Sequence, residues 1–240
     1  MNIPIKIAFN NAWNLFKINY LKYILFSLLI FVIAIFAHTI LFGFQYLGVY
    51  SSDMLELYRG SFGIQIILLA TQLALFCINI FVPSFLGCWL TLTYYCFFLD
   101  NYHNKATEIS ITLFKPKAEI FFYYLIASWL VGAAIGIGFL LLIIPGIILF
   151  ARMAFYGFLI IDEKHGPLSS IEESWLLTKG HTWKLIGFFA LALLFNLLGF
   201  LCLIFGTLVT APITFLAFIN IFEQLKRAQD MSSKIESSTN

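Results

Sequence analysis

Charged residues are scarce in this 240-residue sequence, and their scarcity excludes an ordinary soluble domain. Only 11% of the residues are Asp, Glu, Lys or Arg, whereas a soluble domain averages about 25%. Hydrophobic residues make up 61% of the chain, which is more apolar surface than a protein core can hide from water. We therefore expect lipid to surround much of the chain.

Signatures of nucleic-acid binding and of catalysis are also missing. The net charge is only +2, without a dense basic patch, which argues against a nucleic-acid partner. The sequence contains no nucleophile elbow, no Ser/His or Cys/His triad arrangement and no Gly-rich phosphate loop. Asp162 and His165 share a turn, but two ligands do not make a metal site. The sequence predicts no enzyme, no catalytic residue, no cofactor and no metal.

The four cysteines give no redox or metal signal either. All lie in apolar runs and no pair has C-x-x-C spacing, so we expect buried thiols that act as small hydrophobes. No small-residue cleavage site follows the first apolar run, so we expect no cleaved signal peptide.

Long apolar segments are what the chain does contain. A helix needs about 20 apolar residues to cross a bilayer. Candidate segments lie at residues 21–43, 64–99, 120–142, 146–161, 185–206 and 212–222. The second is too long for one simple span, so either it projects beyond the bilayer or Pro83 divides it into a re-entrant piece and a short span. The sequence predicts an all-α polytopic membrane protein with six transmembrane helices.

Three prolines suggest an internal repeat. Pro83, Pro145 and Pro212 each separate two apolar segments, and a Lys-containing segment precedes each pair. Trp13 aligns with Trp175 in the same register. Further matches pair Lys17 with Lys179 and Lys22 with Lys184, while Lys115 fits the same slot in the middle copy. We predict three parallel repeats of an interfacial helix and two spans, with Pro83, Pro145, Gly146 and Pro212 as helix-break and repeat markers.

The repeats would cover residues 1–100, 101–163 and 164–230 of a single membrane domain at 1–230. The polar, Ser-rich residues 231–240 are predicted to form a disordered cytoplasmic tail. Nearly all of the 14 Lys and Arg residues collect on one predicted side of the membrane, and only Arg59 lies on the other, in a loop at 45–61. The positive-inside rule then places both termini in the cytoplasm.

Each repeat opens with a candidate interfacial helix. In the first, apolar residues recur at helical spacing and Lys6 and Lys17 lie opposite them, which indicates a helix on the inner leaflet with its lysines toward anionic headgroups. The alternative is a connector packed on neighbouring helices. In the third, Ser169 with Glu172 or Ser170 with Glu173 would form a capping box before an apolar face of Ile171 and Trp175. The predicted membrane-surface residues are Lys6, Trp13, Lys17, Lys22, Lys115, Lys117, Trp175, Lys179 and Lys184.

Arg152 is the charged residue inside a predicted span, near mid-membrane depth. Such a charge usually faces a bundle interior, a cavity or a partner. One hypothesis is that its guanidinium holds an anionic lipid headgroup or substrate. The alternative is that it donates to carbonyls where Pro145 loosens the hairpin, or reaches a carboxylate such as Asp162 or Asp100. No acidic residue lies inside any apolar run, so a proton relay is not expected.

Other polar and small residues in the spans have ordinary roles in helix packing. We expect Asn79, Asn196 and Asn220 to form hydrogen bonds between helices. Three glycines in one span, Gly132, Gly136 and Gly138, are typical of close helix packing.

Residues 139–194 carry a family resemblance. The segments that carry it are Ile143-Ile144-Pro145-Gly146-Ile147, Arg152, Ile161-Asp162-Glu163, and the run from Ser170 to Gly180 that contains Ser174-Trp175 and Thr178-Lys179-Gly180. They resemble the uncharacterised YciC-like bacterial inner-membrane proteins, and they are similar to the membrane region of some glycerophosphoryl diester phosphodiesterases. The resemblance implies a six-helix inner-membrane protein without an assigned reaction, because the phosphodiesterases carry catalysis in a separate soluble domain.

Two functions follow as hypotheses. The first is a non-enzymatic bacterial inner-membrane protein that binds anionic inner-leaflet lipids, a membrane protein partner or a second copy of itself, and supports envelope homeostasis. The alternative is a transporter or lipid translocator with a central cavity around Arg152. A wide polar cavity that includes Arg152 would favour transport, whereas a dry core with lateral lipid grooves would favour binding.

Overall fold

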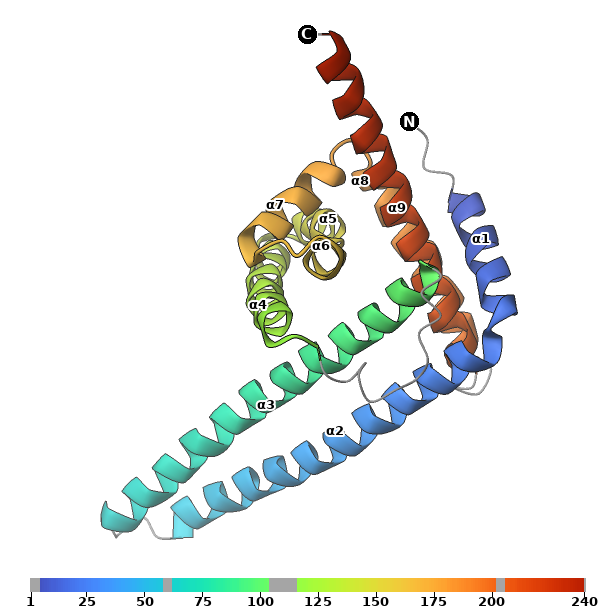
Figure 1. Cartoon of the computed structure of the whole chain (residues 1–240). Coiled ribbons are helices and arrows are strands. Elements are labelled where there is room, and N and C mark those ends of the chain that lie inside the picture. The colour runs from blue at the N-terminus through green and yellow to red at the C-terminus, as the bar shows by residue number, and fades with distance from the viewer. Residues whose placement is uncertain (1–4, 58–61, 104–115, 202–205, 240) are drawn as a thin grey trace. The chain divides into compact units, whose positions relative to one another are not determined.

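A computed structural model describes residues 5–57, 62–103, 116–201 and 206–239 (Figure 1). Within these ranges the chain forms nine helices and no strand, so the predicted all-α class is confirmed there. In chain order the helices are α1 (Ile5–Ile18), α2 (Tyr20–Leu57), α3 (Phe62–Tyr102), α4 (Ala118–Leu141), α5 (Ile143–Met153), α6 (Tyr156–Asp162), α7 (Pro167–Leu177), α8 (Thr182–Leu201) and α9 (Thr207–Thr239).

Six helical segments of the described chain are long and apolar enough to cross a membrane. They are Tyr20–Gly43, Phe62–Tyr102, Ala118–Leu141, Ile143–Asp162, Thr182–Leu201 and Thr207–Met231. Their number and approximate positions match the six predicted segments, and α5 and α6 together make the fourth. The chain therefore has the character of a multi-pass membrane protein.

Helices α2 and α3 are longer than the sequence predicts. Helix α3 is continuous through Pro83, so of the two alternatives for this segment the long helix is correct. Its 41 residues would extend about 61 Å, roughly twice the thickness of a bilayer core. Helix α2 continues to Leu57, so the loop predicted at 45–61 is wrong over most of its length. Met54, Leu55 and Glu56 are good helix formers, which explains the extension.

The prolines do not mark helix breaks in the way the repeat predicts. Pro83 and Pro212 lie inside α3 and α9, so the helix-break prediction is wrong for both. Pro145 is the third residue of α5, where its missing N–H has no intrahelical partner to lose. The chain turns between α4 and α5 at Leu142, which has extended dihedrals. Gly146 is buried against the Phe139 ring, and the threefold repeat stays a prediction.

The C-terminal segment also differs from the prediction. Helix α9 runs to Thr239, so the disordered tail predicted at 231–240 is wrong up to that residue. The polar residues continue a helix whose earlier turns are already packed. Extending a formed helix costs far less than nucleating a new one, which is why composition alone misjudges this segment.

Contacts divide the described chain into two compact units. The larger consists of Met1–Leu28 with Leu92–Asn240, and the smaller is Leu29–Thr91. The larger unit has an aromatic core around Phe158, which is fully buried. Its ring centroid lies 4.7 Å from that of Tyr95, 5.1 Å from that of Phe222 and 5.2 Å from that of Phe218.

Polar contacts join helices within the larger unit. Asn196 Nδ2 donates to Thr214 Oγ1 at 2.9 Å, and Asn220 Nδ2 donates to the Tyr102 hydroxyl at 3.0 Å, so both asparagines bridge helices as predicted. Asn79 instead donates to the Leu75 carbonyl of its own helix. At the end of α6, Lys226 Nζ pairs with Asp162 and Glu163 at 3.0 and 2.7 Å.

Candidate functional site

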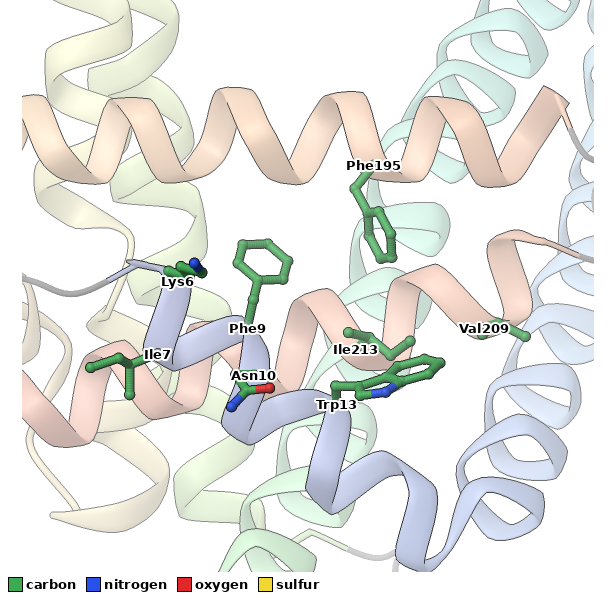
Figure 2. A pocket seen from close by; sticks show the side chains of 8 residues that line it. All are labelled: Lys6, Ile7, Phe9, Asn10, Trp13, Phe195, Val209 and Ile213. Atoms are coloured by element: carbon green, nitrogen blue, oxygen red, sulfur yellow. The ribbon is translucent and has the colours of Figure 1, made fainter.

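A groove of about 820 Å³ lies between α1, α8 and α9 in the larger unit (Figure 2). Its lining residues come from all three helices: Lys6, Ile7, Phe9, Asn10 and Trp13 from α1, Phe195 from α8, and Val209 and Ile213 from α9. Apart from Lys6 and Asn10, the lining is apolar or aromatic.

Helix α1 forms one wall because its small residues allow close packing on α9. Ala8, Ala12 and Phe16 are buried, and small side chains let helices approach within a membrane. The Phe9 ring centroid lies 5.6 Å from that of Phe188 and 6.1 Å from that of Phe195, both on α8. The predicted amphipathic helix is therefore present. Protein buries Ala8, Ala12 and Phe16 of its apolar face, whereas Trp13 on the same face is 42% exposed.

The groove is polar at one end and apolar at the other. Lys6 and Val209 lie at opposite ends in Figure 2. The Phe9 ring of α1 packs against the Phe188 ring of α8, which aligns the two helices. Lys6 lies about one helical turn before Phe9, and Lys184, in the first turn of α8, lies one turn before Phe188. Lys6 therefore lies toward the start of α8. Trp13, Ile213 and Val209 lie toward the start of α9, which is free of charged residues.

The other predicted surface residues have varied positions. Lys17 Nζ lies 5.1 Å from the Trp13 ring centroid, a cation–π distance. Lys22 donates to Asn101 Oδ1 at 3.1 Å. Lys179 is exposed, Lys184 is half-buried, and Lys117 directly precedes α4. Lys115 lies outside the described residues.

A second hollow, a cavity of about 430 Å³, lies among α3, α4, α5, α6, α8 and α9 of the larger unit. Its walls include Tyr95, Gly132, Phe150, Met153 and Phe189. Gly132 was predicted to serve close helix packing, but a Cβ on Gly132 or Gly136 would meet no atom within 4 Å, so that prediction is wrong for both. It holds for Gly138, where a Cβ would lie 2.7 Å from Leu149 Cδ1.

The cavity adjoins an interruption between α5 and α6. Side chains of α7 and of its C-cap residue satisfy the backbone groups that the interruption frees. Ser174 Oγ donates to the Arg152 carbonyl at 2.9 Å and accepts from the Phe155 N–H at 3.2 Å. Thr178 Oγ1 lies 3.2 Å from the same carbonyl. Both side chains are fully buried. We refer to Ser174 and Thr178 as the hydroxyl clamp.

The hydroxyl clamp corrects the prediction for this helix. Helix α7 begins at Pro167 with Gly166 as its N-cap and no side-chain cap, so the two capping boxes are wrong. Ser169 and Ser170 instead donate to carbonyls within the first turn. The most buried face carries Ser170, Ser174 and Thr178 rather than Ile171 and Trp175. Their spacing of four residues was the signal that sequence reasoning missed.

Arg152 lies beside the clamp but not in either hollow. Its Nε donates to Thr182 Oγ1 at 3.3 Å, and its guanidinium carbon lies 4.3 Å from the Trp175 ring centroid. Thr182 is the first residue of α8, so the guanidinium reaches the end of that span rather than its middle. Among the residues that the structure describes, Arg152 forms no ion pair, and Asp162 pairs with Lys226 instead. Gly180, at φ +81°, forms the turn between Trp175 and Thr182.

Part of the chain is similar to a known family of domains. Residues 119–235 match a family model described as a domain of unknown function, DUF7847. The matched part runs from α4 into α9 and includes Arg152, the hydroxyl clamp and most of the cavity, but not α1 with Lys6. No curated protein and no solved structure matches the chain. The resemblance to YciC-like proteins and to the phosphodiesterase membrane region stays a prediction.

Proposed function

We propose that the protein is a non-enzymatic multi-pass protein of the bacterial inner membrane, with both termini cytoplasmic, that binds anionic phospholipid in the groove between α1, α8 and α9. The observation that supports this proposal is the polarity of the groove, which has Lys6 at one end and apolar walls beyond it. That pattern complements a molecule with a negative headgroup and an apolar tail.

Each part of the lipid has a partner in the groove. An acyl chain lies against Phe9, Phe195 and Ile213, and the phosphate pairs with Lys6 beside the amide of Asn10. The α1 wall from Lys6 to Trp13 is about 10 Å long, at about 1.5 Å per residue. Surrounding lipid is as apolar as the groove, so the walls alone provide no selectivity. Selection of anionic lipid therefore depends on Lys6, whose charge-assisted hydrogen bonds favour a phosphate.

The physiological role of this binding would be envelope homeostasis, and a membrane protein partner or a second copy of the chain remains a candidate partner. The alternative function is a transporter or lipid translocator with a central cavity around Arg152. Arg152 lines neither the groove nor the cavity described above, and both have mainly apolar walls, so we prefer lipid binding.

Native mass spectrometry of detergent-purified protein tests the proposal, with dioleoyl phosphatidylglycerol and dioleoyl phosphatidylcholine as probes. We expect the wild-type protein to retain the phosphatidylglycerol preferentially. Lys6→Gln should lower its retention about tenfold, the effect of one lost charge-assisted contact. Lys179→Gln removes the same charge from an exposed site outside the groove and should retain the lipid. Equal losses in the two variants, or no loss in either, would contradict the proposal.

A further inference from the structure

The cavity beside the α5–α6 interruption is a second candidate binding site, and it is separate from the groove because the two share no lining residue. We propose that it binds a single-chain apolar molecule with a carbonyl or carboxyl oxygen, of the class of a free fatty acid. The chain would lie along the apolar walls and the oxygen would accept a hydrogen bond from the Tyr95 hydroxyl.

Tyr95 supplies one polar group of this site, and Ser128 and Tyr156 are the other hydroxyl-bearing residues of its lining. Its ring is fixed by Phe158 and Phe215, with centroids 4.7 and 4.9 Å away. Its hydroxyl forms no hydrogen bond with any residue that the structure describes, although Tyr95 lines the cavity. A hydroxyl without a partner in apolar surroundings is costly. An acceptor oxygen on a bound molecule would remove that cost.

The walls define the rest of the ligand. Val131, Ile135, Phe150 and Phe189 give apolar surface, and Met153 adds a flexible side chain that adapts to irregular shapes. Among the residues that the structure describes, no Asp, Glu, Lys or Arg lines the cavity, so the described lining offers a phosphate or a second charged group no ionic partner. A neutral carbonyl or a protonated carboxyl group fits this lining, and a phospholipid headgroup does not.

The cavity depends on the interruption and opens beside Gly132. Met153, Ala154 and Tyr156 flank the break between α5 and α6 and line the cavity, while the hydroxyl clamp holds the freed backbone groups on the side of α7. Gly132 is exposed and also lines the cavity, and a Cβ there would meet no atom within 4 Å. This opening on α4 gives a chain in the lipid phase a way in.

Photolabelling of the full-length protein in nanodiscs tests the inference, with palmitic acid that carries a mid-chain diazirine as the probe. We expect adducts on peptides of α4, α5 and α6 that line the cavity. Gly132→Leu fills the opening and should lower labelling about tenfold. Gly136→Leu makes the same change one turn along α4, outside the lining and equally free of close neighbours, and should label like the wild-type protein. Equal labelling of the two variants would overturn the site.

A second experiment tests whether the ligand of the cavity carries an oxygen that accepts a hydrogen bond. Tyr95→Phe keeps the packed ring and should lower labelling by the fatty acid about fivefold, the usual effect of one hydrogen bond. A diazirine probe of equal length without the carboxyl group should label both proteins alike. No response of fatty-acid labelling to Tyr95→Phe would overturn the assignment of an oxygen-bearing ligand. Lys6→Gln should leave cavity labelling unchanged, so this inference and the proposed lipid groove can fail separately.

Discussion

The most apolar stretch of α3 and that of α9 are both suited to a membrane, yet their surroundings differ completely. None of the residues in the α3 stretch is buried in protein, whereas 61% of those in the α9 stretch are. Large side chains such as Ile67, Leu73 and Phe76 are exposed on α3 within the smaller unit. In α9, residues from Ile213 to Phe222 are mostly buried in the larger unit.

This difference shows that apolar character identifies a span but not its neighbours. In a membrane, lipid and protein are equally apolar surroundings, so helix packing is marked by small and hydrogen-bonding residues. Helix α9 carries Thr210, Thr214 and Asn220, which form hydrogen bonds to α8 or α3. In the smaller unit, Asn79 and Thr71 donate to carbonyls of their own helix.

The largest expected contrast concerns two phenylalanines. Phe158→Ala removes the ring at the centre of the aromatic core and should lower the free energy of unfolding by about 3–5 kcal/mol. Phe76→Ala in α3, where the ring is 64% exposed, should change it by less than about 0.5 kcal/mol. Equilibrium unfolding in mixed detergent micelles measures both. Similar losses would mean that the smaller unit is also held by packed neighbours.

An intermediate effect is expected at the hydroxyl clamp. Ser174→Ala leaves the buried Phe155 N–H without its acceptor and removes one donor to the Arg152 carbonyl. Such a loss should cost about 1–3 kcal/mol of unfolding free energy. Ser169→Ala, on the exposed side of the same helix, is the matched control and should be nearly neutral. A neutral Ser174→Ala would show that the interruption does not depend on α7.

The smallest expected effect on the free energy of unfolding concerns the hydrogen bond between α8 and α9. A double-mutant cycle of Asn196→Ala and Thr214→Val should give a coupling of about 0.6 kcal/mol, the average for such pairs in a membrane. Asn79→Ala in the smaller unit should leave the unfolding free energy unchanged, because Asn79 bonds to its own helix. Zero coupling in the cycle would show that the hydrogen bond between Asn196 and Thr214 does not stabilise the packing of α9 on α8.

The sequence predicts the number and approximate bounds of the six spans because bilayer thickness sets the length of an apolar segment. It does not predict that Pro83 and Pro212 lie inside helices, because a proline's effect depends on what satisfies the freed carbonyl. The break between α5 and α6 lies at Ala154 and Phe155, without a Pro or Gly to mark it. Tertiary contacts with Ser174 and Thr178 sustain that break.

The candidate sites were predicted only in part. Lys6 and Trp13 were expected to face lipid as surface residues of an amphipathic helix, and both line the groove. The groove itself needs Phe195, Val209 and Ile213, which are far from α1 in the sequence and become neighbours only through folding. Arg152 is a charge within a predicted span, but its guanidinium lies on Trp175 of α7 and donates to Thr182 at the start of α8. The cysteine prediction was wrong for Cys77, which is exposed.

The most direct test of lipid binding in the groove uses Trp13 as a reporter. In a variant that replaces Trp89, Trp129, Trp175 and Trp183 by Phe, brominated phosphatidylglycerol should quench Trp13 fluorescence about threefold more strongly than brominated phosphatidylcholine at equal mole fraction, a preference on the scale of one headgroup contact. Lys6→Gln in that background should make the two lipids equal. Equal quenching with Lys6 in place would mean that the groove holds bulk lipid without selection, and would contradict the proposed function.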